Sequence, residues 1–273
     1  MKRAIRLIFF LIIYFIGQLP ALAQNDSLFR LLKKINYPVT SFAVDNLGEL
    51  YLINLDNQLK KFSENGDSIG VFNQVTKYGK LTNVQAQNPW KALLFYKDFA
   101  TIVMLDKYLN VTGSINLRNK NIFKVNAFIT SYDNNIWLYD EQDNKIKKID
   151  DNGNVLMEST DFRRIFDEAI SPKKIIDDNG LLYLYDPEKG LYVFDYYGSF
   201  KRKIIELHWN DFAILDKKIY GFDSTHFFEY QPLTNDVIST QFPEIIKGSK
   251  EIKIANHRIY SLKGQQLTIF SMQ

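Results

Sequence analysis

The residues best able to do chemistry in this chain are few and scattered. Its three histidines are His208, His226 and His257, and no HxxxH or HExxH spacing joins them. The chain has no cysteine, which excludes thiol catalysis, haem attachment and iron–sulfur clusters. Neither a GxSxG nucleophile turn nor a glycine-rich phosphate loop occurs. We therefore predict no catalytic residue, no metal site and no cofactor.

The tryptophans are more suggestive. Trp137 falls inside a predicted strand and should be core, whereas Trp90 lies near the end of another strand. Trp209 lies in a connection between His208 and Asn210, where an indole could stack on a sugar or anchor a protein interface. The alternative for Trp209 is a loop aromatic that packs on its own part of the fold.

A second candidate surface is basic, with aromatic residues nearby. Its members lie in segments predicted to connect strands: Lys77, Tyr78, Lys80, Arg118, Lys120, Arg163, Arg164, Lys173 and Lys174. If these segments share one face, they form a positive patch that suits an acidic partner. Ordinary solvated lysines are the alternative interpretation. Together with Trp209, these are the predicted partner-binding residues.

Six internal repeats of roughly 40 residues determine where these side chains go. Each begins with an apolar–aromatic run and continues, after a polar turn, with a second alternating run. The repeats are Glu49–Phe72, Lys91–Leu117, Asn135–Ser159, Leu181–Ile205, Lys217–Phe242 and Arg258–Phe270. Short alternating strands at this period predict an all-β fold, a six-bladed β-propeller with one blade per repeat.

The first blade illustrates the expected four strands. They are predicted at Thr40–Asp45, Glu49–Asn54, Gln58–Ser63 and Asp67–Phe72. Asn46–Gly48 and Glu64–Gly66 provide turns, because Asn and Gly tolerate positive φ. Alternation within the second strand should turn its two leucines toward one neighbouring blade, and Tyr51 and Ile53 toward the other.

The last blade needs a strand from elsewhere. The sixth repeat supplies only three strands before Gln273, and Leu28–Ile35 lies unused ahead of the first blade. Pairing of this segment with Gln266–Phe270 would close the ring and remove two exposed sheet edges. The alternative is an amphipathic helix, since the leucines of the segment also suit a helical period.

One segment between the third and fourth blades departs from the strand pattern. Ser159–Pro172 places its apolar residues on one helical face, and Asp161 is among the residues that could cap it. Arg163–Asp167 and Arg164–Glu168 have i,i+4 spacing. We expect one short helix here, on the face that carries the basic connections.

Residues 1–23 have the features of a secretion signal. Three basic residues precede an apolar run at Leu7–Ile16, and Ala21-Leu22-Ala23 fits a cleavage site. An uncleaved membrane anchor is the alternative, although the run is short for a span of about 20 residues. We predict a cleaved signal, a propeller domain over residues 24–273 and no transmembrane span after cleavage.

The predicted signal also accounts for the positive net charge of the chain. The chain has a formal net charge of +3, and its first 23 residues contain three basic and no acidic residues. The remainder is neutral, so nothing indicates a nucleic-acid partner. A secreted domain without cysteine fits the periplasm of a Gram-negative bacterium.

The repeats resemble those of NHL-like six-bladed propellers. The resemblance rests on FAVDNLGELYLIN, IIDDNGLLYLYD and KIKKIDDNGNVL, and it covers residues 24–273. It implies the fold but no activity, because members include scaffolds, sensors, lactonases and lyases. The metal ligands of the enzymatic members have no clear match. In its export signal and size, the chain is also similar to periplasmic, plug-like accessory proteins of the type 9 secretion translocon.

These observations favour a non-enzymatic periplasmic scaffold. We expect a protein partner, such as an outer-membrane β-barrel complex of the kind that serves type 9 secretion. The first alternative is a carbohydrate- or peptidoglycan-binding propeller that uses Trp209 and the channel mouth. The second is a metal-dependent hydrolase or lyase with its site at that mouth.

Overall fold

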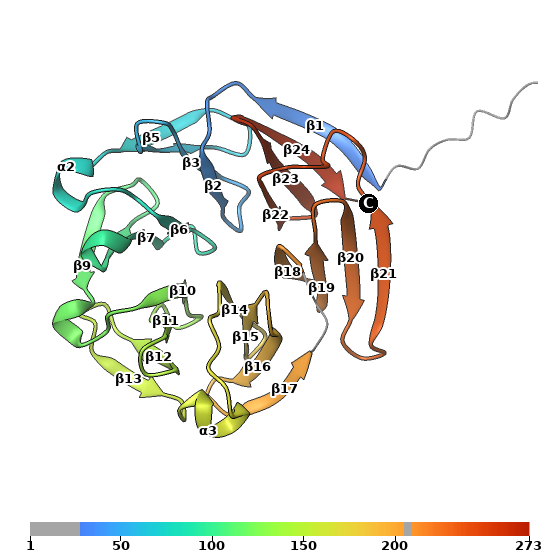
Figure 1. The fold of residues 1–273 in the computed structure, drawn as a ribbon. Coiled ribbons are helices and arrows are strands. Elements are labelled where there is room, and N and C mark those ends of the chain that lie inside the picture. Colours follow the sequence, from blue (N-terminus) through green and yellow to red (C-terminus); the bar gives the residue numbers. More distant parts are fainter. Residues whose placement is uncertain (1–27, 205–208, 273) are drawn as a thin grey trace, which may run out of the picture.

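The computed structural model describes residues 28–204 and 209–272, and these form a six-bladed β-propeller. Each blade is a four-stranded antiparallel sheet, and the six blades surround a common centre (Figure 1). We call the strands of a blade a to d, from the innermost to the outermost. The all-β fold predicted from the repeats is confirmed. The predicted signal at residues 1–23 lies outside the described residues.

The first three blades follow the chain in order. Blade 1 consists of β2 (Ser41–Val44), β3 (Leu50–Ile53), β4 (Leu59–Phe62) and β5 (Ser68–Phe72). Blade 2 consists of β6 (Asn83–Gln85), β7 (Ala92–Tyr96), β8 (Thr101–Leu105) and β9 (Val111–Asn116). Blade 3 consists of β10 (Val125–Thr130), β11 (Ile136–Asp140), β12 (Lys145–Ile149) and β13 (Val155–Glu158).

The other three blades complete the ring. Blade 4 consists of β14 (Lys174–Asp178), β15 (Leu181–Asp186), β16 (Gly190–Asp195) and β17 (Phe200–Ile204). Blade 5 consists of β18 (Asp211–Leu215), β19 (Lys218–Phe222), β20 (His226–Gln231) and β21 (Asp236–Gln241). Blade 6 consists of β22 (Glu251–Ala255), β23 (Arg258–Lys263), β24 (Gln266–Met272) and β1 (Phe29–Ile35).

Blade 6 joins the two ends of the chain. β1 pairs antiparallel with β24, from Phe29 opposite Met272 to Ile35 opposite Leu267. Figure 1 shows β1 as the outer strand beside β24. The closing strand is therefore confirmed, and the amphipathic helix considered for this segment is wrong.

The core lies between the blades. In β3, Leu50 and Leu52 pack with buried residues of blade 6, whereas Tyr51 and Ile53 pack with residues of blade 2 such as Leu94. This is the division predicted from alternation. Trp137 is fully buried between blades 3 and 4, as expected for blade core. Since both faces of a blade are covered, the inner strands are almost continuously apolar.

Aspartates organise several of the turns. The Asp106 carboxylate accepts the N–H groups of Tyr108 and Asn110, and Asp45 accepts those of Leu47 and Glu49 in the same way. Asp150 and Asp195 repeat the pattern in blades 3 and 4. These Asx-type bonds satisfy backbone donors that the strand ladders leave free.

The predicted helix between blades 3 and 4 exists but is short. α3 spans Phe162–Phe166 and ends at Asp167, which is left-handed with φ 55°. Its N-cap is Asp161, as the sequence indicated. We did not predict the second short helix, α2 (Val75–Tyr78), or the two 3-10 turns, η1 (Lys97–Phe99) and η2 (Arg118–Lys120). In the described part of the chain, no helix has the length and apolar character needed to cross a membrane.

Asp45 provides a test of the turn chemistry. It is fully buried, and desolvation outweighs its hydrogen bonds and raises its pKa to about 6. The folded chain therefore binds a proton that the unfolded chain releases, so stability should fall as the pH rises from about 4 to about 6. Asp45→Asn keeps the acceptor oxygen and should raise the unfolding free energy at neutral pH by about 1–3 kcal/mol.

Asp106→Asn is the matched control, because Asp106 makes the same turn at the surface. Hydrogen bonds from Asn110 lower the pKa of Asp106, so its stabilising effect is lost as the pH falls and the Asn variant should be destabilised. Urea unfolding of both variants from pH 4 to 8 measures the two effects. If both variants lost the same amount of unfolding free energy at neutral pH, the role that we assign to burial of Asp45 would be wrong.

Candidate functional site

The inter-blade connections and the b–c turns lie at one end of the propeller, because antiparallel strands alternate in direction. Two neighbouring connections at this end, residues 73–82 and 117–124, contain five basic residues and no acidic residue. With η1 between them, we call these segments the basic sector. Figure 1 shows them next to one another along one side of the ring, around blade 2.

Two hydrogen bonds and a packing contact join the three segments of the basic sector. The Lys97 N–H donates to Thr82 Oγ1 at 3.1 Å, and Arg118 Nη2 donates to the Asp98 carbonyl oxygen at 2.9 Å. Gly79 lies against the Phe99 ring, since a Cβ there would come within 2.8 Å of it. Phe99 and Phe123 are each about half exposed. The sector is thus one surface that carries cations and exposed aromatic rings.

Six of the predicted partner-binding cations are exposed at this end, one of them Lys173 just before β14. Lys77, Lys80 and Arg118 belong to the basic sector, and Lys77 Nζ lies 4.8 Å from the centre of the Tyr78 ring. Lys120 is partly buried and donates to Asn154 Oδ1 at 2.9 Å, so it contacts the c–d turn of blade 3. Arg163 and Arg164 are the other two and lie on α3.

The cations of α3 differ from those of the basic sector. Arg163 pairs with Asp161 at 2.6 Å, which lowers the pKa of that carboxyl to about 2. Glu168 binds Lys189 and Lys203, so the i,i+4 pairs expected on a longer helix do not form. They fail because the helix stops before Asp167. Asp161 therefore balances Arg163 on α3, and Glu141 pairs in the same way with Lys124 of connection 117–124, at 2.6 Å. Among the described residues, no ion pair involves Lys77, Lys80 or Arg118 of the basic sector.

The two aromatic residues of the prediction are buried. Tyr78 is 8 % exposed and packs on Tyr96, with ring centres 5.2 Å apart. Trp209 is 5 % exposed and stacks on Phe228, and a Cβ at Gly221 would lie 1.9 Å from its indole. Neither ring offers a free face, so the expectation of a Trp209 stacking platform is corrected. The alternative, an aromatic packed on its own blade, is what the structure shows.

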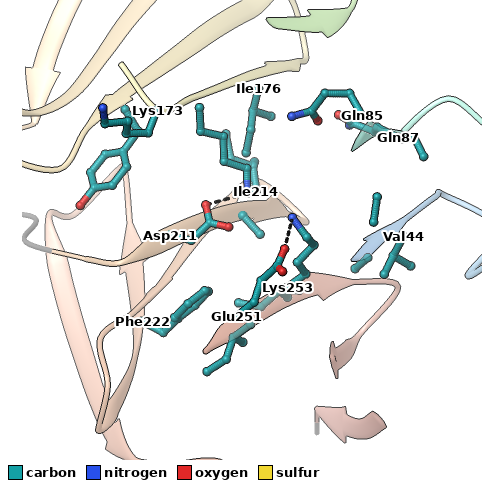
Figure 2. A pocket seen from close by; sticks show the side chains of 18 of the residues that line it. Val44, Gln85, Gln87, Lys173, Ile176, Asp211, Ile214, Phe222, Glu251 and Lys253 are labelled. Atoms are coloured by element: carbon teal, nitrogen blue, oxygen red, sulfur yellow. Dashed lines mark hydrogen bonds and ion pairs between the residues drawn. The ribbon is translucent and has the colours of Figure 1, made fainter. Parts of the chain in front are cut away.

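Lys173 and Lys174 lie at a cavity in the centre of the ring. The cavity has a volume of about 380 Å³ and is lined by the a strands, including Gln85, Asp211 and Lys253. Figure 2 shows Asp211, Glu251 and Lys253 reaching into it from β18 and β22, with Gln85 and Gln87 across from them. The sequence prediction did not anticipate that Lys174 would lie in the channel rather than on the outer face.

Two ion pairs occupy this cavity. Lys174 Nζ binds Asp211 at 2.8 Å and the Phe212 carbonyl oxygen, while Lys253 binds Glu251 at 3.1 Å. Desolvation lowers the pKa of Lys174, and the nearby Lys253 adds to the effect. Desolvation also acts on Lys253, but Glu251 and Asp211 outweigh it and raise its pKa. The side-chain amines of Lys174 and Lys253 in this cavity therefore have pKa values shifted in opposite directions.

Metal-ligating groups do not come together within residues 28–204 and 209–272. No group of three or more His, Asp or Glu residues in this part could hold a metal ion. His226 lies beside Asp223 in a b–c turn, and His257 lies near Asp216 in an a–b turn, at the other end of the blades. His208 lies outside the described residues.

Comparison with known proteins supports the fold. No family model matches the chain, and neither does any curated protein. Among solved structures, virginiamycin B lyase from Staphylococcus aureus has a TM-score of 0.64 at 11 % identity, over 90 % of this chain and 99 % of that one. The β-propeller domain of Cps50 (Swd1) from Myceliophteria thermophila reaches 0.60 at 8 % identity, over 90 % and 100 %.

A chain of the Mitotic Checkpoint Complex is also similar. Its TM-score is 0.57 at 9 % identity, over 85 % of this chain and 74 % of that one. Identities this low establish a shared propeller architecture, which serves both a lyase and parts of protein assemblies. The architecture is a rigid scaffold, so the function of this chain has to be argued from its own surface.

The two channel lysines should react differently with an acylating reagent. Their side chains are 25 % and 29 % exposed, so access is nearly equal. Because its pKa is lowered, Lys174 has more free amine at mildly alkaline pH and should be acetylated several-fold faster than Lys253. Limiting acetic anhydride followed by peptide mass spectrometry measures both rates in one sample.

Asp211→Asn sharpens this test. The Asp211 charge raises the pKa of Lys174, so its removal should make Lys174 react faster still. Lys34 on the outer strand β1 is an exposed reference in the same digest. Equal rates for the two channel lysines would show that desolvation does not act on Lys174 as described.

Proposed function

We propose that this protein is a non-enzymatic scaffold that binds an acidic segment of a protein partner through its basic sector. The observation that carries the proposal is the local excess of charge. Connections 73–82 and 117–124 hold five cations and no acidic residue, although residues 24–273 have no net charge. One of the five, Lys124, pairs with Glu141, and the other four have no ion pair among the described residues. A local positive surface on a neutral protein steers acidic partners and suppresses others.

The exposed rings of the sector support a protein partner in particular. Phe99 and Phe123 are half exposed among the cations, and a phenylalanine has no polar atom to satisfy in water. Aromatic anchors surrounded by polar residues are typical of protein interfaces. Arg118 suits the same role, because its guanidinium can bind a carboxylate with two parallel hydrogen bonds.

The location of the protein is part of the proposal. Residues 1–23 have the pattern of an export signal, and a chain without cysteine suits the periplasm. We propose that the scaffold works there as an accessory subunit of an outer-membrane complex, such as the translocon of type 9 secretion. The similarity to a chain of the Mitotic Checkpoint Complex is compatible with a role in an assembly.

Charge reversal in the basic sector tests the proposal. We expect the triple variant Lys77→Glu, Lys80→Glu, Arg118→Glu to lose most partner recovery in affinity purification from native membranes in mild detergent. Its melting temperature should change little, because surface charges contribute only about 0–1 kcal/mol each. Recovery by the unaltered protein should also decrease as salt concentration rises.

The control is a matched reversal away from the sector. Lys34→Glu with Lys217→Glu changes two exposed lysines, on β1 and in the a–b turn of blade 5. This variant should retain the partner. Equal recovery by the control and the triple variant would remove the basic sector from the interface. A co-purified outer-membrane barrel in near-stoichiometric amount, lost only with the triple variant, would support the proposed location as well.

A further inference from the structure

The a–b and c–d turns join the strand ends that lie away from the inter-blade connections, and exposed aromatic side chains gather in these turns. They belong to blades 2, 3 and 4: Trp90 (64 % exposed), Tyr108 (64 %), Tyr132 (67 %) and Tyr197 (84 %). Exposed apolar surface of this extent marks interaction or ligand-binding sites more often than chance. The basic sector does not include any of these residues.

The fold itself does not require aromatic residues at these positions. Tyr108 and Tyr197 each lie two residues after a turn aspartate, whose carboxylate accepts their N–H. The equivalent position in blade 3 is Asn152, and its N–H makes the same bond to Asp150. Any residue with a backbone N–H can make this turn, so the hydrogen bonds of the turn do not explain the tyrosine rings.

Contacts connect four of the rings in two pairs, and Tyr197 directly follows one of the four in sequence. Lys107 Nζ lies 4.5 Å from the centre of Trp90 and 4.8 Å from that of Tyr108, so it bridges these two rings. Tyr132 stacks on Tyr196 with centres 4.7 Å apart and planes 7° from parallel. We call Trp90, Tyr108, Tyr132, Tyr196 and Tyr197 the aromatic turn surface.

Amides link its two halves. Asn88 Oδ1 accepts the backbone N–H of Trp90 at 2.9 Å, and the Asn88 side-chain amide donates to Asn134 Oδ1 at 3.1 Å. Asn134 lies in the same turn as Tyr132. Lys91 donates to the Asn134 carbonyl oxygen and binds Asp151. Donors and acceptors therefore lie between the rings.

We propose that the aromatic turn surface binds a saccharide chain. The flat C–H faces of a sugar ring stack on indole and phenol rings, while its hydroxyl groups need donors and acceptors close by. The exposed rings here are tryptophan and tyrosine, which combine an apolar face with a polar atom. At the opposite end the exposed rings are Phe99 and Phe123, without polar atoms. This contrast favours a polyhydroxylated ligand at the turn end.

The tryptophans provide a selective reporter. Trp137 and Trp209 are buried, at 0 % and 5 % exposure, so Trp90 is the tryptophan that an aqueous quencher reaches. A bound saccharide should protect Trp90 from iodide quenching. The probes are soluble cello-, chito-, xylo- and malto-oligosaccharides, added to the purified protein. We expect protection by at least one series, with saturation.

Variants that keep Trp90 locate the site. Tyr132→Ala and Tyr108→Ala should each weaken binding by about fivefold to tenfold, the contribution of one stacked ring. Phe99→Ala is the matched control, an exposed ring removed from the other end, and should leave affinity unchanged. Circular dichroism melting checks that all three variants are folded.

Three results would overturn the proposal. They are no protection by any oligosaccharide series, equal weakening by Phe99→Ala, and unchanged affinity in both tyrosine variants. Loss of a co-purified protein from Tyr132→Ala, without saccharide protection of the unaltered protein, would instead assign the surface to a protein partner. None of these results bears on the basic sector, which the charge-reversal variants test separately.

Discussion

The structure depends on closure of the ring by β1 and β24. Each blade buries both of its faces against neighbours, so a blade with only three strands would leave part of the first and last inter-blade cores exposed. Phe29 and Ile35 of β1 belong to those two cores and are 6 % exposed each. Closure also pairs strands from opposite ends of the chain, and such long-range pairing is slow to form. The two terminal segments thus contribute to stability at one shared blade.

Closure leaves the two ends of the propeller and its outer strands for recognition, and the turns make the two ends chemically different. At the turn end, aspartates such as Asp106 and Asp195 hold short turns and project one residue at the tip. At the connection end, longer segments pass from an outer strand to the next inner strand. They have room for cations and for α2 and α3. This asymmetry is the basis on which we propose different ligands for the two ends.

The fold could be predicted because repeats, alternation and Asn-Gly turns are local signals that all agree. The site could be predicted only in part, because burial depends on partners far away in sequence. Trp209 is covered because Gly221, on β19, has no side chain to exclude the indole. Lys174 lies in the channel because it is the first residue of an inner strand. The basic residues next to it in sequence give no indication of that position. The exposure of Trp90 could not be predicted either, because both Trp90 and Trp137 lie in or near predicted strands, and Trp137 is buried in the core.

The placement of charge decides which part of the connection end can attract a partner. In the central cavity, Lys174 and Lys253 face Asp211 and Glu251, so the cluster compensates its own charge. A compensated cluster has little field beyond a Debye length of about 8 Å. On α3, Asp161 compensates Arg163 in the same way. Connections 73–82 and 117–124 lack internal acidic residues, and Lys77 and Lys80 remain exposed. For the acidic partner that we propose, long-range attraction would therefore begin at the rim around blade 2. The central cavity would act only on groups that enter it.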